Sequence, residues 1–123
     1  MKKVYFATPV NGRQEATLAE KKAAALARCV EVRNHLKRLH PDWVITYSFM
    51  VCPINQVLTE AEAMGRCVTL LMSCDMIVMD DSVLSTNKQS KGCKLEWWAA
   101  DVYSIEKKFL KDIFVEPKEI VKL

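Results

Sequence analysis

The chain has 123 residues, of which 50% are hydrophobic and 27% are charged, and its formal net charge is +3. This length and composition predict one globular domain spanning residues 1–123. The small net charge gives no indication of a nucleic-acid polymer as partner. The longest apolar stretch, from Val68 to Met79, is too short and too polar to span a membrane.

The first half of the chain predicts two strands separated by a long helix. Lys3–Ala7 is typical of a short buried strand, and the Pro- and Gly-containing segment Thr8–Arg13 of a loop. The segment from about Gln14 to Leu39 contains no Pro or Gly and predicts a helix. Val44–Val51 is rich in β-branched and aromatic residues and predicts the second strand. The apolar stripe of the helix, at helical spacing, consists of Leu18, Ala25, Cys29, Val32, Leu36 and Leu39.

The second half continues the alternation. Thr59–Glu62 has the pattern of a capping box, which predicts a helix from there to about Ser73. Asp75–Asp80 is almost continuously apolar, as in a central parallel strand. The ten-residue loop Asp81–Ser90 is long for an α/β connection and is therefore a functional candidate. The remaining predicted elements are a helix from Gly92 to about Ser104, a strand over Phe109–Val115 and a short edge strand over Ile120–Leu123.

This order of elements predicts an α/β fold with a four- to five-stranded parallel sheet and helices on both faces. We expect the first strand to be central. Because Thr8–Arg13 and Asp81–Ser90 each follow a strand and precede a helix, both loops should meet at the carboxyl end of the sheet. Ligands bind at that end in such folds.

The five cysteines indicate reduced thiols in a cytoplasmic protein. They form no C-x-x-C pair, and the two histidines, His35 and His40, lie in and directly after the first predicted helix, at no zinc-ligand spacing from a cysteine. A zinc site is therefore not expected, and we expect neither a metal nor a cofactor. The odd count and the apolar neighbourhoods favour buried, unpaired thiols.

The segment from Ser90 to Glu96 contains the main candidate site. A loop, a glycine and a helix start follow one another there, so Ser90 and the Gly92 backbone amide are placed to bind a phosphate. Ser90 is equally suited to capping the helix. Between Asp81 and Glu96 the chain has three lysines, Lys88, Lys91 and Lys94, and no acid, which favours an anion. The alternative is a solvated, solubilising loop.

Glu96 is the candidate nucleophile. It shares a helix face with Cys93, Ala100 and Tyr103, next to an apolar stripe formed by Leu95, Trp98 and Val102. We expect partial screening from water, which raises the pKa of a carboxyl group, and a carboxylate so placed can attack a sugar carbon. The alternative is a surface glutamate favoured by the helix macrodipole.

Several other residues have candidate roles near this site. Asp80 and Asp81 end the third predicted strand, where either is placed to bind a ribose hydroxyl or to orient a water. Asp75 begins that strand and is expected to be structural. Arg13 either pairs with an anion or is solvated. Trp97 and Trp98 are expected to pack in the core or against other helices, and the alternative is that at least one of them lines a pocket for the base.

The chain resembles the nucleoside 2-deoxyribosyltransferase superfamily. The residues that carry the resemblance are Val4-Tyr5-Phe6-Ala7 with Pro9 and Gly12, the strand Cys74–Met79, and Ser90-x-Gly92-x-x-x-Glu96 followed by Ala99 and Ala100. The last motif is similar to that of the deoxynucleoside 5'-monophosphate N-glycosidases and of small bacterial and phage relatives.

The resemblance implies a flavodoxin-like (Rossmann-like) three-layer sandwich that cleaves an N-glycosidic bond. It implies that Glu96 is the nucleophile, that Tyr5 positions the sugar or the nucleophile, and that the ligand is a nucleoside or nucleotide. It also implies a homodimer or larger oligomer. The expected substrate-binding residues are Ala7, Thr8, Pro9, Gly12, Arg13, Asp80, Asp81, Ser90 and Gly92.

The main departure from that family is in the second predicted helix. Members usually carry an aspartate in the second helix, about two turns before the strand aspartate, and this chain has Cys67 there. The sequence therefore supports two functions: an N-glycosidase or deoxyribosyltransferase, and a catalytically silent nucleotide-binding module. A purely structural partner is a third, weaker reading. The sequence does not distinguish hydrolysis from transfer, one base from another, ribose from deoxyribose, or a nucleoside from its phosphate.

For the homodimer, the expected surface is the alanine-rich side of the long helix, formed by Ala19, Ala23, Leu26 and Val30.

Overall fold

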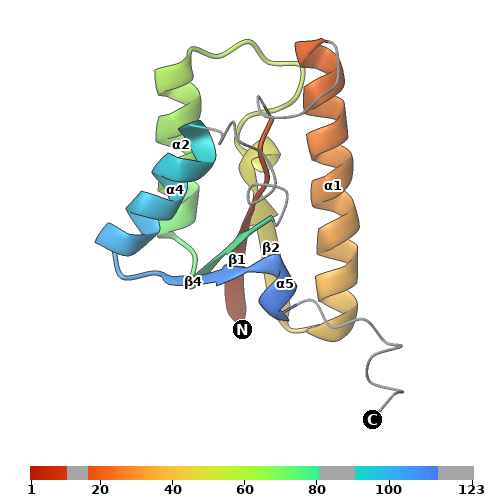
Figure 1. Cartoon of the computed structure of the whole chain (residues 1–123), viewed down its shortest axis with the longest axis vertical. Coiled ribbons are helices and arrows are strands. Elements are labelled where there is room, and N and C mark those ends of the chain that lie inside the picture. The colour runs from red at the N-terminus through yellow and green to blue at the C-terminus, as the bar shows by residue number, and fades with distance from the viewer. Residues whose placement is uncertain (11–16, 81–90, 114–123) are drawn as a thin grey trace.

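The structure, a computed structural model, describes residues 1–10, 17–80 and 91–113. Within these ranges four parallel strands form one sheet in the order β2-β1-β3-β4. They are β1 (Lys2–Ala7), β2 (Trp43–Tyr47), β3 (Met76–Met79) and β4 (Glu106–Phe109). The α/β prediction is therefore confirmed, and β1 is one of the two central strands (Figure 1).

Helices cover both faces of the sheet and give the three layers of a flavodoxin-like or Rossmann-like fold. Successive strand residues point to opposite faces, so Tyr5 and Ala7 pack with α2 and α4, while Val4 and Phe6 pack with α1. In Figure 1, α1 lies on one side of the sheet and α2 with α4 on the other. The described helices are α1 (Leu18–Leu39), α2 (Glu60–Met72), α4 (Lys91–Val102) and the short α5 (Leu110–Ile113), and a 3-10 turn, η1, covers Ser48–Met50.

The helix starts follow their capping residues. The Thr17 hydroxyl accepts a hydrogen bond from the Glu20 amide, so α1 begins at Leu18 rather than near Gln14 as predicted. Thr59 and Glu62 form the predicted capping box, and α2 begins at Glu60.

Two predicted strands were placed wrongly. Val44–Val51 was predicted too long, because the chain turns into η1 at Ser48 and β2 ends at Tyr47. The strand predicted over Phe109–Val115 lies earlier, at Glu106–Phe109, and the next residues form α5. β4 is an edge strand whose lysines and glutamate stay near water, so it lacks the apolar run on which the prediction relied. The predicted edge strand Ile120–Leu123 lies outside the described residues.

Candidate functional site

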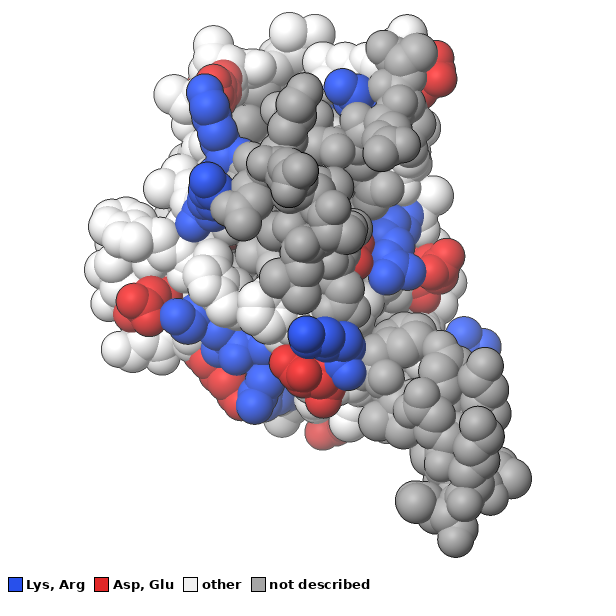
Figure 2. Space-filling model, in the orientation of Figure 1, with Lys and Arg blue, Asp and Glu red and all other residues white. Residues whose placement is uncertain are grey.

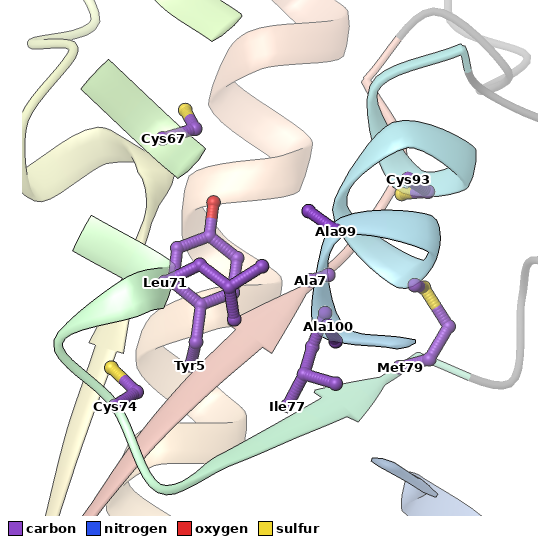
Figure 3. Packing of buried hydrophobic residues seen from close by; sticks show 10 residues of the cluster. All are labelled: Tyr5, Ala7, Cys67, Leu71, Cys74, Ile77, Met79, Cys93, Ala99 and Ala100. Carbon is purple, nitrogen blue, oxygen red and sulfur yellow. The ribbon is translucent and has the colours of Figure 1, made fainter. Parts of the chain in front are cut away.

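Tyr5 places a phenol inside the layer between the sheet and helices α2 and α4. The side chain is 0% exposed and belongs to the core cluster that includes Cys67, Leu71 and Ala99. Figure 3 shows its hydroxyl pointing along β1, away from Cys74 and toward the side where Cys67 lies. Burial, and then the nearby charge of Glu96, raise the pKa of Tyr5 well above its ordinary value. The phenol therefore keeps its proton at neutral pH.

Glu96 lies in the second turn of α4 and is 6% exposed. Cys93 and Ala100, three residues before it and four after it, are buried on the same side of the helix, which carries the carboxyl group into the protein. Burial raises the pKa of Glu96 to about 7, against a smaller opposing effect of the Tyr5 phenol. The predicted screening from water is thus confirmed, and the reading as a surface glutamate is wrong.

Two buried oxygens of this site have no hydrogen-bond partner among the described residues: Tyr5 Oη and Glu96 Oε2. The two groups are close enough to shift each other's pKa, but their contact does not have the geometry of a full hydrogen bond. Buried polar atoms are nearly always bonded, so an unpartnered pair on facing elements is unusual. Tyr5 Oη can therefore donate a hydrogen bond to a bound molecule, and Glu96 Oε2 can accept one from it.

Cys67 is the third member of the site. It stands on α2, where the resembled family has an aspartate, and its thiol interacts with both Tyr5 and Glu96. Its sulfur lies 3.8 Å from that of Cys52, and both cysteines are free. Burial, Glu96 and Cys52 together raise the pKa of the Cys67 thiol to about 12. The position is therefore occupied by a neutral, weakly polar group in place of an acid.

Asp80 lies at the end of β3, where Thr8 and Arg28 both bind its carboxylate. It is 1% exposed and accepts hydrogen bonds from the Thr8 hydroxyl at 2.7 Å and from Arg28 Nε and Nη2 at 3.2 Å each. Arg28 was not predicted from the sequence as a site residue. The sequence feature that predicts such a partner is Asp80 itself, which ends an apolar strand. A carboxylate buried there requires a cation or several hydrogen-bond donors nearby. Asp80 thus links β3 to α1 and fixes the start of the loop after β1.

The other predicted site residues fall into three groups. Ala7 and Pro9 are buried where β1 ends, and Gly92 is half-buried in the first turn of α4. Asp75 lies at the opposite end of the sheet, where its carboxylate accepts the Lys3 amide at 2.9 Å, so its structural reading is confirmed. Gly12, Arg13, Asp81 and Ser90 lie outside the described residues.

The two tryptophans differ from each other. Trp97 is half-buried and stacks on Phe109 with ring centroids 5.0 Å apart. Trp98 is 62% exposed, so its prediction as a core residue is wrong. The stripe expected next to Glu96 is exposed as well: Leu95 is 38% and Val102 is 53% exposed. The sheet-facing side of α4 is instead formed by Cys93, Glu96, Ala99 and Ala100.

Away from Glu96, a basic groove of about 620 Å³ runs beside α1 and the edge strand β2. Its cationic residues are spread along an open surface, and it contains neither Tyr5 nor Glu96. It therefore offers no buried acid or nucleophile for bond cleavage. The residues that line it are Arg33, Asn34, Lys37, Arg38, Val44, Ile45 and Met50.

In residues 1–10, 17–80 and 91–113 no cluster of three potential metal ligands occurs, and no helix there is long and apolar enough to cross a membrane. A family model described as a domain of unknown function (DUF4406) matches residues 2–108. No curated protein matches the chain.

Proposed function

Because the chain belongs to the DUF4406 family, a domain of unknown function, we propose its activity from the site itself: cleavage of the N-glycosidic bond of a nucleoside or nucleotide. The observation that carries the proposal is a pair of buried oxygens, Glu96 Oε2 and Tyr5 Oη, neither of which has a hydrogen-bond partner among the residues that the structure describes. Keeping two such groups without partners costs stability. Binding a polar substrate offsets that cost.

The reaction uses Glu96 as nucleophile. Its carboxylate oxygen attacks the anomeric carbon of the sugar, the bond from that carbon to the base nitrogen breaks, and the base leaves with the bonding electrons and takes up a proton. Water then attacks the same carbon and releases the sugar from Glu96, or a second base takes the place of water. Only the ionised carboxylate attacks, so a pKa of about 7 leaves Glu96 about half reactive at neutral pH.

Tyr5 positions the nucleophile. Its phenol favours the charged form of Glu96 and keeps its own proton, so it donates a hydrogen bond to the carboxylate or to a sugar hydroxyl. This assignment agrees with the resemblance of the chain to the nucleoside 2-deoxyribosyltransferase superfamily. The proposal requires no metal or cofactor, and it places the protein in the cytoplasm, where its free thiols stay reduced.

One observation favours a second function, a nucleotide-binding module without catalysis. Cys67 interacts with Tyr5 and Glu96 where an acid would assist departure of the base, and its raised pKa keeps the thiol neutral. Without that acid, the leaving base has to take its proton from water. A site of this kind still binds the nucleotide.

The test is release of free base from a panel of ribonucleosides, deoxyribonucleosides and their 5'-monophosphates. We expect release by the wild type and a loss of about 10³-fold in Glu96→Gln, which keeps the shape and removes the charge. Glu106→Gln, at an exposed carboxylate of β4, is the matched control and should leave the rate unchanged. Binding without release would favour the second function, and equal release by wild type and Glu96→Gln would exclude Glu96 as nucleophile.

A further inference from the structure

An apolar stripe lies on the outer side of α4, opposite the surface that packs on the sheet. Leu95, Trp98 and Val102 follow one another at spacings of three and four residues, so their side chains form one row along the helix. Their exposed fractions are 38%, 62% and 53%. Uncharged atoms dominate the surface over the second half of α4 in Figure 2. Three large apolar side chains in one exposed row are a mark of an interaction surface.

Two of the charges beside this stripe, Lys94 and Asp101, have opposite signs. Lys94 and Asp101 are seven residues apart, so they lie on the same flank of the stripe, one near each end. On the other flank Ala99 is buried, so that side already packs within the protein. When two copies of α4 pack antiparallel about a two-fold axis, the same flank of each helix lies on the same side of the pair. The N-terminal end of one helix then lies beside the C-terminal end of the other. Lys94 of each copy then faces Asp101 of the other.

We propose that the α4 surface formed by Lys94, Leu95, Trp98, Asp101 and Val102 binds a second copy of this chain as an antiparallel, two-fold symmetric helix pair. A parallel pair would place Lys94 against the Ala99 flank and leave both charges unmatched, so the charge pattern selects the antiparallel arrangement. Asp101 already bonds Lys107 at 2.8 Å, and its carboxylate is 68% exposed, which leaves an oxygen for the partner's lysine.

The proposed contact differs from the one expected on α1. Of the α1 residues named for that role, Leu26 and Val30 are half-buried and Ala23 contributes only a methyl group. A tryptophan with large aliphatic neighbours is the stronger anchor. The pairing does not depend on the proposed activity, so each is tested without the other.

The experiment is sedimentation equilibrium of the full chain from low to high micromolar concentration. We expect a wild-type dimer and a weakening of at least about 100-fold in Trp98→Lys. Ala23→Lys, on the exposed side of α1, should dimerise like the wild type. Circular dichroism confirms that each variant is folded, which is expected because Trp98 is mostly exposed.

A charge exchange tests the antiparallel register itself. Asp101→Lys alone and Lys94→Asp alone should each weaken the dimer about tenfold, because each places like charges together. The double exchange, Lys94→Asp with Asp101→Lys, should restore wild-type affinity. A monomeric wild type, a dimer unaffected by Trp98→Lys or broken by Ala23→Lys, or a double exchange as weak as the single variants would each overturn the proposal.

Discussion

The phenol of Tyr5 favours the charged form of Glu96, while the charge on Glu96 raises the pKa of Tyr5. The two side chains come from β1 and α4, at opposite ends of the sequence, and meet only because the sheet and the helix pack together. Burial outweighs the help of the phenol, so the pKa of Glu96 stays raised, at about 7. The raised pKa of Glu96 affects both the stability of the protein and the proposed activity.

The first prediction concerns stability. The pKa of Glu96 is about 7 in the folded protein, against 4.5 for an ordinary glutamate. Between these values the folded protein holds a proton that the unfolded chain has lost, so the stability contribution of this group falls as pH rises from 4.5 to 7. Glu96→Gln removes the buried charge and should raise the free energy of unfolding at pH 8 by about 2 kcal/mol.

Urea denaturation at pH 8 and at pH 4.5 checks this. At the lower pH the wild-type carboxyl is protonated, so the two proteins should be nearly equally stable. Glu106→Gln serves as control, because it removes an exposed carboxylate and should change stability little at either pH. A Glu96→Gln protein that is less stable than wild type at pH 8 would contradict the account of the buried charge.

The second prediction concerns Tyr5→Phe. Loss of the phenol removes the group that favours ionised Glu96, so the pKa of Glu96 should rise above its wild-type value of about 7. The pH profile of base release should rise through pH 7 in wild type and at higher pH in the variant. At neutral pH the rate should fall about tenfold or more. An unshifted profile with a merely lower rate would show that Tyr5 contacts the substrate without tuning the nucleophile.

Much of the fold was predictable from the sequence because it depends on local signals. The capping box at Thr59 and the apolar run of β3 each determine an element from neighbouring residues. The exposure of Trp98 was not predictable, since it depends on which side of α4 faces the sheet. Glu96, a charged residue, occupies that side while the tryptophan does not. Polarity alone therefore gives the wrong orientation at a site where a carboxyl is buried.

Only part of the candidate site was predictable, because some of its contacts depend on how distant segments pack together. Glu96 and Tyr5 were named from motifs, and Cys67 was named because the resembled family has an aspartate at that position; the structure brings Cys67 next to both. Cys52 was not foreseen, because its approach to Cys67 depends on how the segment after β2 packs against α2.

The third prediction concerns Cys67→Asp. If the missing acid limits the reaction, an aspartate here should raise base release, because two carboxyls that share a site hold one proton between them, and that proton can pass to the leaving base. The same repulsion should lower the free energy of unfolding above pH 7. Cys67→Ser, which adds no charge, is the control and should leave the rate within a few-fold of wild type. No gain in rate from Cys67→Asp, in a folded variant that binds nucleotide, would contradict this role.

The fourth prediction concerns the Arg28–Asp80 ion pair. Arg28→Met keeps much of the aliphatic side chain but leaves the Asp80 carboxylate buried with the Thr8 hydroxyl as a remaining donor. The free energy of unfolding should fall by about 2–3 kcal/mol. Adding Asp80→Asn should recover part of this loss, because the buried carboxylate charge is then gone. Additive losses in a double-mutant cycle would show that the two residues do not act as a pair.

The central claim, that Glu96 attacks the sugar, is tested most directly by trapping the intermediate. A nucleotide with fluorine on the sugar carbon next to the anomeric centre slows both steps, because fluorine destabilises the oxocarbenium-like transition states. If the first step remains the faster one, a glycosyl group accumulates on the enzyme. Mass spectrometry of the intact protein and of its peptides should then find one added glycosyl unit, on Glu96. Base release by the wild type with no such adduct, and with the rate retained in Glu96→Gln, would contradict the claim.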